Sequence, residues 1–288
     1  EKEVEIENIK NYDFSKAQIT IFAAGSRVAK EWVPKAAKKT IVIDNSSFFR
    51  MQKNIPLVVP EVNPNALDKH ENIIANPNCS TMQMVLVLKP LHDEYKIKRV
   101  VVSTYQAVSG AGKAAMDELF DQTKNFLDKK KIVSKNFTKQ IAFNLIPHID
   151  VFDKDGYTKE ELKMTNETKK ILDESIDVTA TCVRVPVRTG HSESINIEFE
   201  KPYDLENIID ILNKAPGCKV VDDRKDGGYM TPLEAEGYFT TYISRIRKDN
   251  SNAKSINIWV VSDNLLKGAA LNTVQIAECL MKKFKVSL

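Results

Sequence analysis

The sequence of 288 residues has no long apolar run and no concentration of charge of one sign. No stretch approaches the roughly 18 consecutive apolar residues that a membrane span requires, and the opening residues, EKEVEIENI, are acidic and alternating, unlike a secretory signal. The net charge of +3 and the scattered basic residues, with KKK at 129–131 as the only dense cluster, give nucleic-acid binding no support. We therefore expect a cytoplasmic protein whose partners are neither membranes nor nucleic acids.

Cysteine and glycine are arranged in ways that exclude further classes. The four cysteines stand far apart, without a C-x-x-C pair or a Cys/His cluster, so we expect neither a disulfide framework nor a metal site. The Gly-x-Gly-x-x-Gly fingerprint that normally follows the first strand of a nicotinamide-binding fold is also absent. The residues alone therefore indicate no cofactor. They are compatible with a single catalytic cysteine.

The first part of the chain has the spacing of a parallel sheet. Short apolar runs at 18–24 and 40–47 flank a helical pattern, and a strand at IIA (73–75) leads through a turn into another helix. Pro34 is expected to begin the first regular helix and Pro90 to end the second. This β-α-β order predicts a doubly wound, parallel sheet.

The pattern changes further along the chain. A strand at 96–104 and an amphipathic helix at about 113–130 are followed by alternating segments at 177–200, around a Thr-Gly turn, and at 237–247 and 255–262. This alternation predicts an antiparallel sheet with one covered face, and helices at about 158–173 and 204–214 are expected to cover it. The apolar last helix is expected to pack back on the first domain.

Cys79 is the sharpest candidate for chemistry. It lies in NPNCST, at an expected strand-to-helix turn, where unpaired N–H groups and the helix dipole favour a thiolate and lower a cysteine pKa. A buried, inert cysteine is the alternative, and the two interpretations are about equally supported by the residues alone.

His191 and Arg184 belong to one segment, CVRVPVRTGHSES. His191 opens a strand beside a glycine turn and has the intrinsic pKa of a general base, although a solvated loop histidine is the commoner case. Arg184 interrupts an apolar strand and shares a face with Cys182 if the strand alternates. On a covered face it needs an anion, and its planar fork suits a carboxylate, whereas on an edge strand it would extend to water.

Weaker signals come from three other places. Glu160 and Lys163 share a helical face and could hold the two ends of a polar substrate, although most such pairs are solvated contacts. Arg50 follows a parallel strand, where doubly wound sheets bind ligands. The loop 109–112 (SGAG), ahead of a helix, could cradle a phosphate with backbone N–H groups.

Taken together and in this order, IDNSSFFR, PLVVPEVN, NPNCST, STYQAVSGAG, ELKMTNETKKIL, CVRVPVRTGHSES and VVSDNLLKGAA closely resemble the bacterial aspartate-β-semialdehyde dehydrogenases. The resemblance covers nearly the whole chain. It implies NADP-dependent reductive dephosphorylation of L-4-aspartyl phosphate to L-aspartate 4-semialdehyde through a cysteine thioester, on the route to lysine, threonine and methionine. It also implies a homodimer or homotetramer that binds the semialdehyde and inorganic phosphate.

The resemblance also implies a role for each matching residue. The catalytic group is the nucleophile Cys79, the acid/base His191 and the glutamine Gln106. Arg184 matches the arginine that binds the substrate carboxylate, and Glu160 matches the acidic residue on the side of the substrate amine. The residues that match the phosphate-binding group are Arg50, Asn78 and Lys163. The residues that match what remains of the family's cofactor-binding site are Gly25, Ser26, Ser109, Gly110 and Asn264.

The expected fold is α/β, with two domains. Residues 1–79 and 264–288 are expected to form a Rossmann-like, parallel-sheet NADP-binding domain, and residues 80–263 an α+β catalytic and dimerisation domain with a mixed, largely antiparallel sheet. The family's first β-α-β portion, on the order of 30 residues or more, is expected to be missing at the amino end, so the cofactor domain is expected to be truncated there. Two alternatives remain, a related reductase acting on N-acetylglutamyl phosphate and an inactive scaffold homologue.

Overall fold

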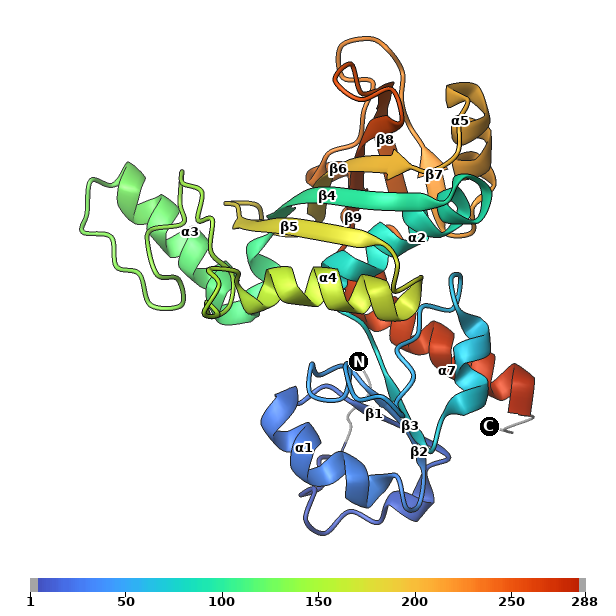
Figure 1. Cartoon of the computed structure of the whole chain (residues 1–288). Helices are drawn as coiled ribbons and strands as arrows, with labels where there is room; N and C mark the ends of the chain where they lie inside the picture. The colour runs from blue at the N-terminus through green and yellow to red at the C-terminus, as the bar shows by residue number, and fades with distance from the viewer. Residues whose placement is uncertain (1–4, 285–288) are drawn as a thin grey trace.

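The computed structural model describes residues 5–284 (Figure 1), so the expected domain ends at 1–4 and 285–288 lie outside the described residues. The first sheet contains three parallel strands in the order β1 (Ile19–Phe22), β2 (Ile41–Asp44) and β3 (Ile73–Ala75). Helix α1 (Gly25–Ala36) connects β1 to β2. The predicted parallel β-α-β arrangement is therefore confirmed.

The second sheet is mixed and has the order β5-β4-β6-β9-β8-β7. Its strands are β4 (Ile97–Gln106), β5 (Asp177–Arg184), β6 (His191–Phe199), β7 (Cys218–Val220), β8 (Thr241–Lys248) and β9 (Ser255–Ser262). The two strands around the Thr-Gly turn, β5 and β6, do not pair with each other, because β4 lies between them, parallel to β5 and antiparallel to β6. The carboxyl ends of β4 and β5 consequently meet at one edge of the sheet.

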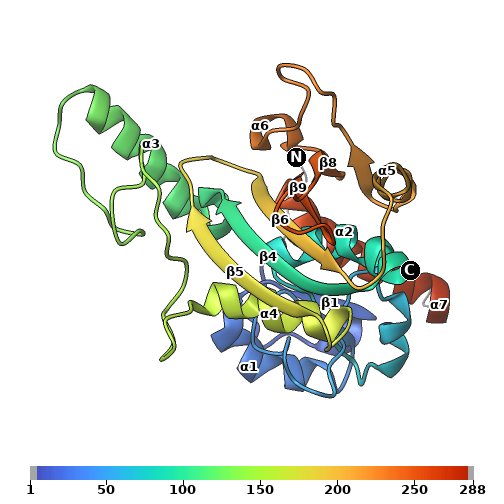
Figure 2. The same ribbon diagram turned by 45° about the horizontal axis from the view of Figure 1, so that its top comes forward.

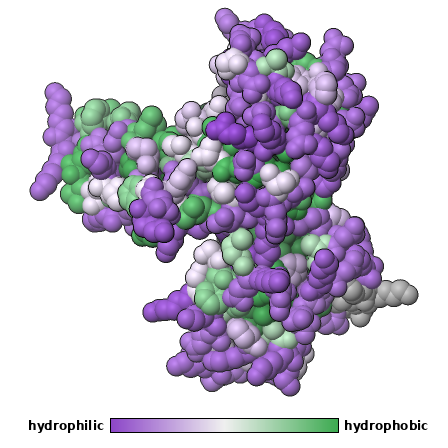
Figure 3. All heavy atoms as spheres, viewed as in Figure 1, coloured by the Kyte–Doolittle hydropathy of each residue, from purple (hydrophilic) through white to green (hydrophobic). Residues whose placement is uncertain are grey.

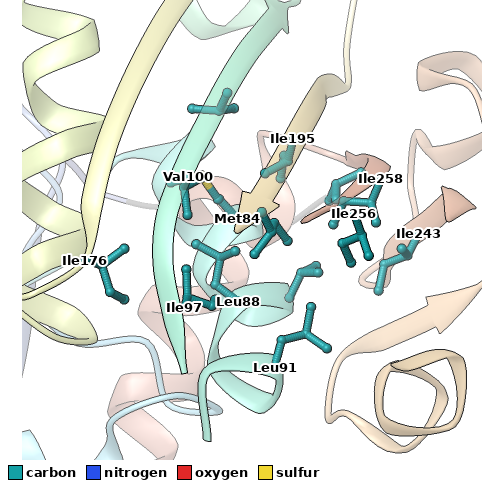
Figure 4. Close-up of a cluster of buried hydrophobic side chains, with 14 of the residues drawn as sticks. Met84, Leu88, Leu91, Ile97, Val100, Ile176, Ile195, Ile243, Ile256 and Ile258 are labelled. Atoms are coloured by element: carbon teal, nitrogen blue, oxygen red, sulfur yellow. The ribbon is translucent and has the colours of Figure 1, made fainter. Parts of the chain in front are cut away.

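Helix α2 (Cys79–Tyr95) lies between the two sheets and contributes to two cores. Met84, Leu88 and Leu91 pack against the second sheet, where Figure 4 shows them beside the isoleucines of β6, β8 and β9. Met82 and Val85 pack with the side chains of the first sheet instead. Residues 80–88 of the helix are therefore buried on all sides rather than along one face, and the thiol at its first residue lies between the two layers.

The other helices are α3 (Lys113–Leu127), α4 (Lys159–Ile171), α5 (Leu205–Lys214), α6 (Pro232–Ala235) and α7 (Leu271–Phe284). Helix α7 packs on the first sheet through Ile276 and Leu280, as expected. Helix α4 lies beside β5, and Figure 2 shows it below the edge of the second sheet. Helix α3 and the segment after it project as an arm, on which Figure 3 shows hydrophobic residues at the surface.

Both expectations about proline are wrong. Helix α1 begins at Gly25 and includes Pro34, and α2 continues through Pro90 to Tyr95. Each proline removes one intrahelical hydrogen bond. In α2 the burial of Leu91 and Tyr95 beyond Pro90 offsets this loss, so tertiary packing extends the helix past the local stop signal. No helix among residues 5–284 is both long and apolar enough to cross a membrane.

Candidate active site

A cleft of about 520 Å³ lies where the two sheets and α4 meet. Twelve of the thirteen residues predicted for the site line it, and these are Gly25, Ser26, Arg50, Asn78, Cys79, Gln106, Ser109, Gly110, Glu160, Lys163, Arg184 and Asn264. They come from segments that are far apart in the sequence, so the fold brings them together. The thirteenth residue, His191, lies directly behind the cleft wall.

Asn78 positions the first turn of α2. Its side-chain oxygen accepts hydrogen bonds from the N–H groups of Ser80 (3.0 Å) and Thr81 (3.2 Å), so it is the N-cap of the helix. Its side-chain NH₂ donates to Glu160 at 2.8 Å. Cys79 is therefore the first residue of a capped helix, and its position relative to α4 is fixed by the residue before it.

The environment of the Cys79 thiol differs from the expectation. Burial, followed by the negative charge of Glu160, raises its pKa to about 12, while the cations Arg50 and Arg184 act in the opposite direction. The expected lowering of the pKa by the helix N-terminus is therefore wrong for the free protein. Here desolvation outweighs the helix dipole and both arginines, so the free protein carries a thiol at neutral pH.

His191 is fully buried, so the solvated-loop interpretation is wrong. Its Nδ1 accepts a hydrogen bond from the N–H of Ala107 at 3.0 Å, which assigns the proton of the neutral ring to Nε2. Burial and the charge of Arg184 lower its pKa to about 3. A Cβ added to Gly110 would lie 3.1 Å from Nε2, so this glycine allows the cleft wall to lie against the ring.

Gln106 and Arg184 end the parallel strands β4 and β5 side by side. Arg184 is buried and donates from Nη1 to the carbonyl oxygen of Ala107 at 2.6 Å, which leaves its other N–H groups without a hydrogen bond to a described residue. Gln106 accepts from the hydroxyl of Thr104 and donates to Glu160 at 3.1 Å. Arg184 therefore faces the cleft rather than extending to water from the edge strand.

Glu160 connects the polar residues of the cleft. It accepts hydrogen bonds from Asn78, Gln106 and Lys163, the last at 3.0 Å. Burial raises the pKa of Glu160, but Lys163 and the hydrogen bonds lower it by more, so the group is a carboxylate. Lys163 also donates to Asp150 at 2.9 Å, a residue that the sequence did not indicate. Burial lowers the pKa of Lys163, whereas Glu160 and Asp150 raise it by more.

The residues predicted for the cofactor side also meet here. Asn264 accepts from the backbone N–H of Gly190 at 2.8 Å and is hydrogen-bonded to Ser109 at 3.0 Å. Gly25 begins α1, and Ala24 before it provides no side-chain cap, so the first N–H groups of this helix have no capping partner. Uncapped N–H groups at a helix start suit an anionic group such as a cofactor phosphate.

Two further features were not found from the sequence. Gly268, in the π-helical segment Leu266–Ala270, lies against Cys79, because a Cβ on it would be 2.7 Å from the Cβ of Cys79. Glu193 is fully buried beside Gln83 on the face of β6 that carries His191. Burial raises the pKa of Glu193 well above its ordinary value, which favours a neutral carboxyl group.

Two protein-family models match most of the chain. Residues 88–267 match the model of the "Semialdehyde dehydrogenase, dimerisation domain" family, and residues 1–70 match the corresponding NAD binding domain. The aspartate-semialdehyde dehydrogenase of Aquifex aeolicus is 53% identical over 279 residues, which cover 95% of this chain and 82% of that protein.

Two solved structures share this fold, and the first of them is also similar in sequence. Aspartate semialdehyde dehydrogenase II from Vibrio cholerae, complexed with ASA, is 47% identical with a TM-score of 0.94, over 96% of this chain and 83% of that one. The Candida albicans enzyme with NADP, 24% identical over 99% and 86% of the two chains, shares the fold with a TM-score of 0.76. The chain therefore belongs to the aspartate-semialdehyde dehydrogenases, a family of oxidoreductases of amino-acid biosynthesis.

Proposed function

We propose that the protein reduces L-4-aspartyl phosphate to L-aspartate 4-semialdehyde and inorganic phosphate with NADPH, through a thioester on Cys79. The observation that carries this proposal is the cleft itself. One nucleophile, two cationic groups that suit different anions, and a buried histidine converge on it from both sheets. In biosynthesis this reaction would supply the route to lysine, threonine and methionine.

In the covalent step, the sulfur of Cys79 attacks the acyl carbon of aspartyl phosphate, the carbon–oxygen bond to phosphate breaks, and phosphate leaves with the proton of the thiol. The nicotinamide, when bound, supplies a hydride to the thioester carbon. His191 then donates a hydrogen bond from Nε2–H to the oxyanion of the resulting thiohemiacetal, and Gln106 orients that oxygen. The carbonyl bond re-forms, the carbon–sulfur bond breaks, and the semialdehyde leaves while the thiolate of Cys79 takes a proton from solvent. The hydrogen bond to Nδ1 supports this role of His191, because it keeps the N–H group on Nε2.

The two ends of the substrate need opposite charges. Arg184 would bind the α-carboxylate, since most of its N–H groups remain available and a planar guanidinium matches a carboxylate. Glu160 would accept from the α-amino group, because its carboxylate is ionised. Arg50, Lys163 and Asn78 would surround the leaving phosphate, with the two cations supplying the charge.

NADP is the proposed cofactor. Gly25 and Ser26 at the start of α1 would lie near its phosphates, and Ser109, Gly110 and Asn264 near the nicotinamide. The uncapped start of α1 fits such an anion. The preference for NADP over NAD rests on the family resemblance and on the Candida albicans relative described with NADP.

The domain roles follow the same division. Residues 1–79 and 264–288 would bind the cofactor, and residues 80–263 would carry catalysis and dimerisation. The match of residues 88–267 to a dimerisation domain supports a homo-oligomer, for which we propose a homodimer. The projecting arm, with exposed Phe120, Phe126 and Phe143, falls within the matched residues.

The test is phosphate-dependent reduction of NADP⁺ by aspartate semialdehyde, the reverse reaction, with the wild-type protein and with Cys79→Ala. The wild type should turn over only when phosphate is present, and Cys79→Ala should be folded and inactive. Turnover with N-acetylglutamate semialdehyde but not with aspartate semialdehyde would favour the related reductase. A folded wild-type protein that turned over neither substrate would favour the scaffold interpretation.

A further inference from the structure

Helix α4 has four charged residues on one face, and only two of them line the cleft. Glu160, Lys163, Glu167 and Lys170 are spaced at 0, 3, 7 and 10 residues, so they share one helical face. The first two line the cleft, whereas Glu167 and Lys170 lie outside its lining. The catalytic scheme above gives these last two residues no role, although Glu167 is 1% exposed.

Glu167 connects the cleft arginine to the helix of the nucleophile. One of its oxygens accepts from Nη1 of Arg50 at 3.1 Å, and the other accepts from the backbone N–H of Asn78 at 2.6 Å. Asn78 is the N-cap that precedes Cys79. A single buried side chain therefore fixes the distance between an anion-binding cation and the first turn of α2.

Lys170 binds the backbone of the loop that contains Arg50. Its ammonium donates to the carbonyl oxygens of Arg50 at 2.6 Å, Gln52 at 2.8 Å and Ile55 at 2.7 Å. An ammonium has three hydrogens, so all of them are used in fixing this loop. Lys170 thus attaches the loop after β2 to α4, across the boundary between the two sheets.

The guanidinium of Arg50 is held in one orientation as a result. Nε donates to the carbonyl oxygen of Asn76 at 2.9 Å and Nη2 to that of Asn45 at 3.1 Å, in addition to the bond from Nη1 to Glu167. Three of the five N–H groups are therefore used, and each terminal nitrogen keeps one. Two remaining donors on neighbouring nitrogens match two oxygens of a phosphate.

We propose that Glu167 and Lys170 are positioning residues that hold Arg50 in its phosphate-binding orientation and fix it relative to Cys79. The inference rests on the proposed function, because that function assigns Arg50 to phosphate. It predicts that loss of either residue weakens the use of phosphate while leaving the binding of the semialdehyde nearly unchanged.

Lys170→Met and the matched control Lys169→Met provide the first test. Both variants remove one positive charge from the same turn of α4, but within residues 5–284 Lys169 makes only a surface ion pair with Asp177, at 4.0 Å. The KM for inorganic phosphate, in NADP⁺ reduction by aspartate semialdehyde, should rise at least tenfold in Lys170→Met and less than twofold in Lys169→Met. The KM for the semialdehyde should change less than threefold in both.

Glu167→Gln provides the second test, and it keeps the size of the side chain. The amide NH₂ group replaces one of the two accepting oxygens and cannot accept the hydrogen bond from Arg50 or from Asn78. The KM for phosphate should therefore rise, while the thermal unfolding midpoint should stay within a few degrees of the wild-type value. A lower KM for phosphate would mean that Glu167 merely neutralises Arg50, and it would overturn the positioning role. A Lys170→Met enzyme with an unchanged KM for phosphate would overturn the inference while the wild-type activity still supported the proposed function. A wild-type enzyme without phosphate-dependent activity would overturn both.

Discussion

Substitution of Gly268 by alanine should misplace the nucleophile. The new Cβ would lie 2.7 Å from the Cβ of Cys79 and 3.2 Å from its Cα, whereas ordinary contacts begin at 3.4 Å. The shortfall at the closer atom is 3.4 minus 2.7, or 0.7 Å. Neither of these Cys79 atoms belongs to the flexible end of a side chain, so the first turn of α2 or the π-helical segment must move.

The π-helical segment resists such a movement. Lys267, which precedes Gly268, is 1% exposed and donates to Glu61 at 2.7 Å, to Asn272 at 2.9 Å and to Gln275 at 2.7 Å. The displacement therefore falls mainly on the first turn of α2. Because a misplacement of about 1 Å at a reacting group can cost about 100-fold in rate, we expect kcat to fall about 10- to 100-fold.

The assay is steady-state turnover together with thermal unfolding. Overpacking costs about 1–3 kcal/mol, so Gly268→Ala should unfold at a lower temperature but remain folded at 25 °C. Ala270→Gly serves as a control, since it makes the reverse exchange in the same π-helical segment, and it should keep kcat within about threefold. A Gly268→Ala enzyme with the kcat of the wild type would refute the argument that this glycine sets the position of Cys79.

Three other predictions follow from the charges of the site. Because burial raises the pKa of Cys79 to about 12, its alkylation by iodoacetamide in the free enzyme should accelerate about tenfold per pH unit between pH 7 and 10, and a plateau already reached at pH 8 would contradict this. Glu193→Gln should unfold at nearly the wild-type temperature and Glu193→Ala well below it, because burial favours the neutral carboxyl group and an amide has the same shape; equal losses in both variants would contradict a neutral Glu193. Arg184→Lys should raise the KM for the semialdehyde sharply through loss of bidentate binding, and an unchanged KM would remove Arg184 from the carboxylate site.

The buried histidine has a consequence for stability against pH. The folded protein lowers the pKa of His191 from 6.5 to about 3, so between these values the unfolded chain binds a proton that the folded chain does not. The stability that the neutral ring contributes is complete above pH 6.5 and is lost as the pH falls towards 3. The free energy of unfolding of His191→Gln should therefore fall less steeply than that of the wild type as the pH is lowered from 6.5 to 3. Urea unfolding at each pH measures this difference. An identical pH dependence in the two proteins would contradict a neutral, buried His191.

Much of the fold could be predicted from local patterns. The strand expected at 255–262 has those bounds as β9, and the helix expected at 204–214 is α5. The proline signals failed at Pro34 and Pro90 because the energy that extends both helices comes from packing against distant segments rather than from the local sequence.

The residues alone left two interpretations each for Cys79 and Arg184, and the family resemblance singled out these two residues, which line the cleft. The site was not predictable where function depends on contacts across the fold. Glu167 is 117 residues from Arg50 and 89 from Asn78, and only the helical spacing shared with Glu160 could have indicated that it faces the site. The raised pKa of Cys79 was missed for the same reason, since desolvation depends on the packed structure.

The proposed reaction depends on a covalent thioester on Cys79, and this thioester can be trapped. The enzyme is incubated with aspartate semialdehyde and NADP⁺ without phosphate, quenched in acid and analysed by intact and peptide mass spectrometry. We expect a mass increase equal to one aspartyl group, located on the peptide that contains Cys79 and removed when phosphate is added before the quench. An active enzyme that carried no such adduct, or carried it on another residue, would exclude a thioester on Cys79.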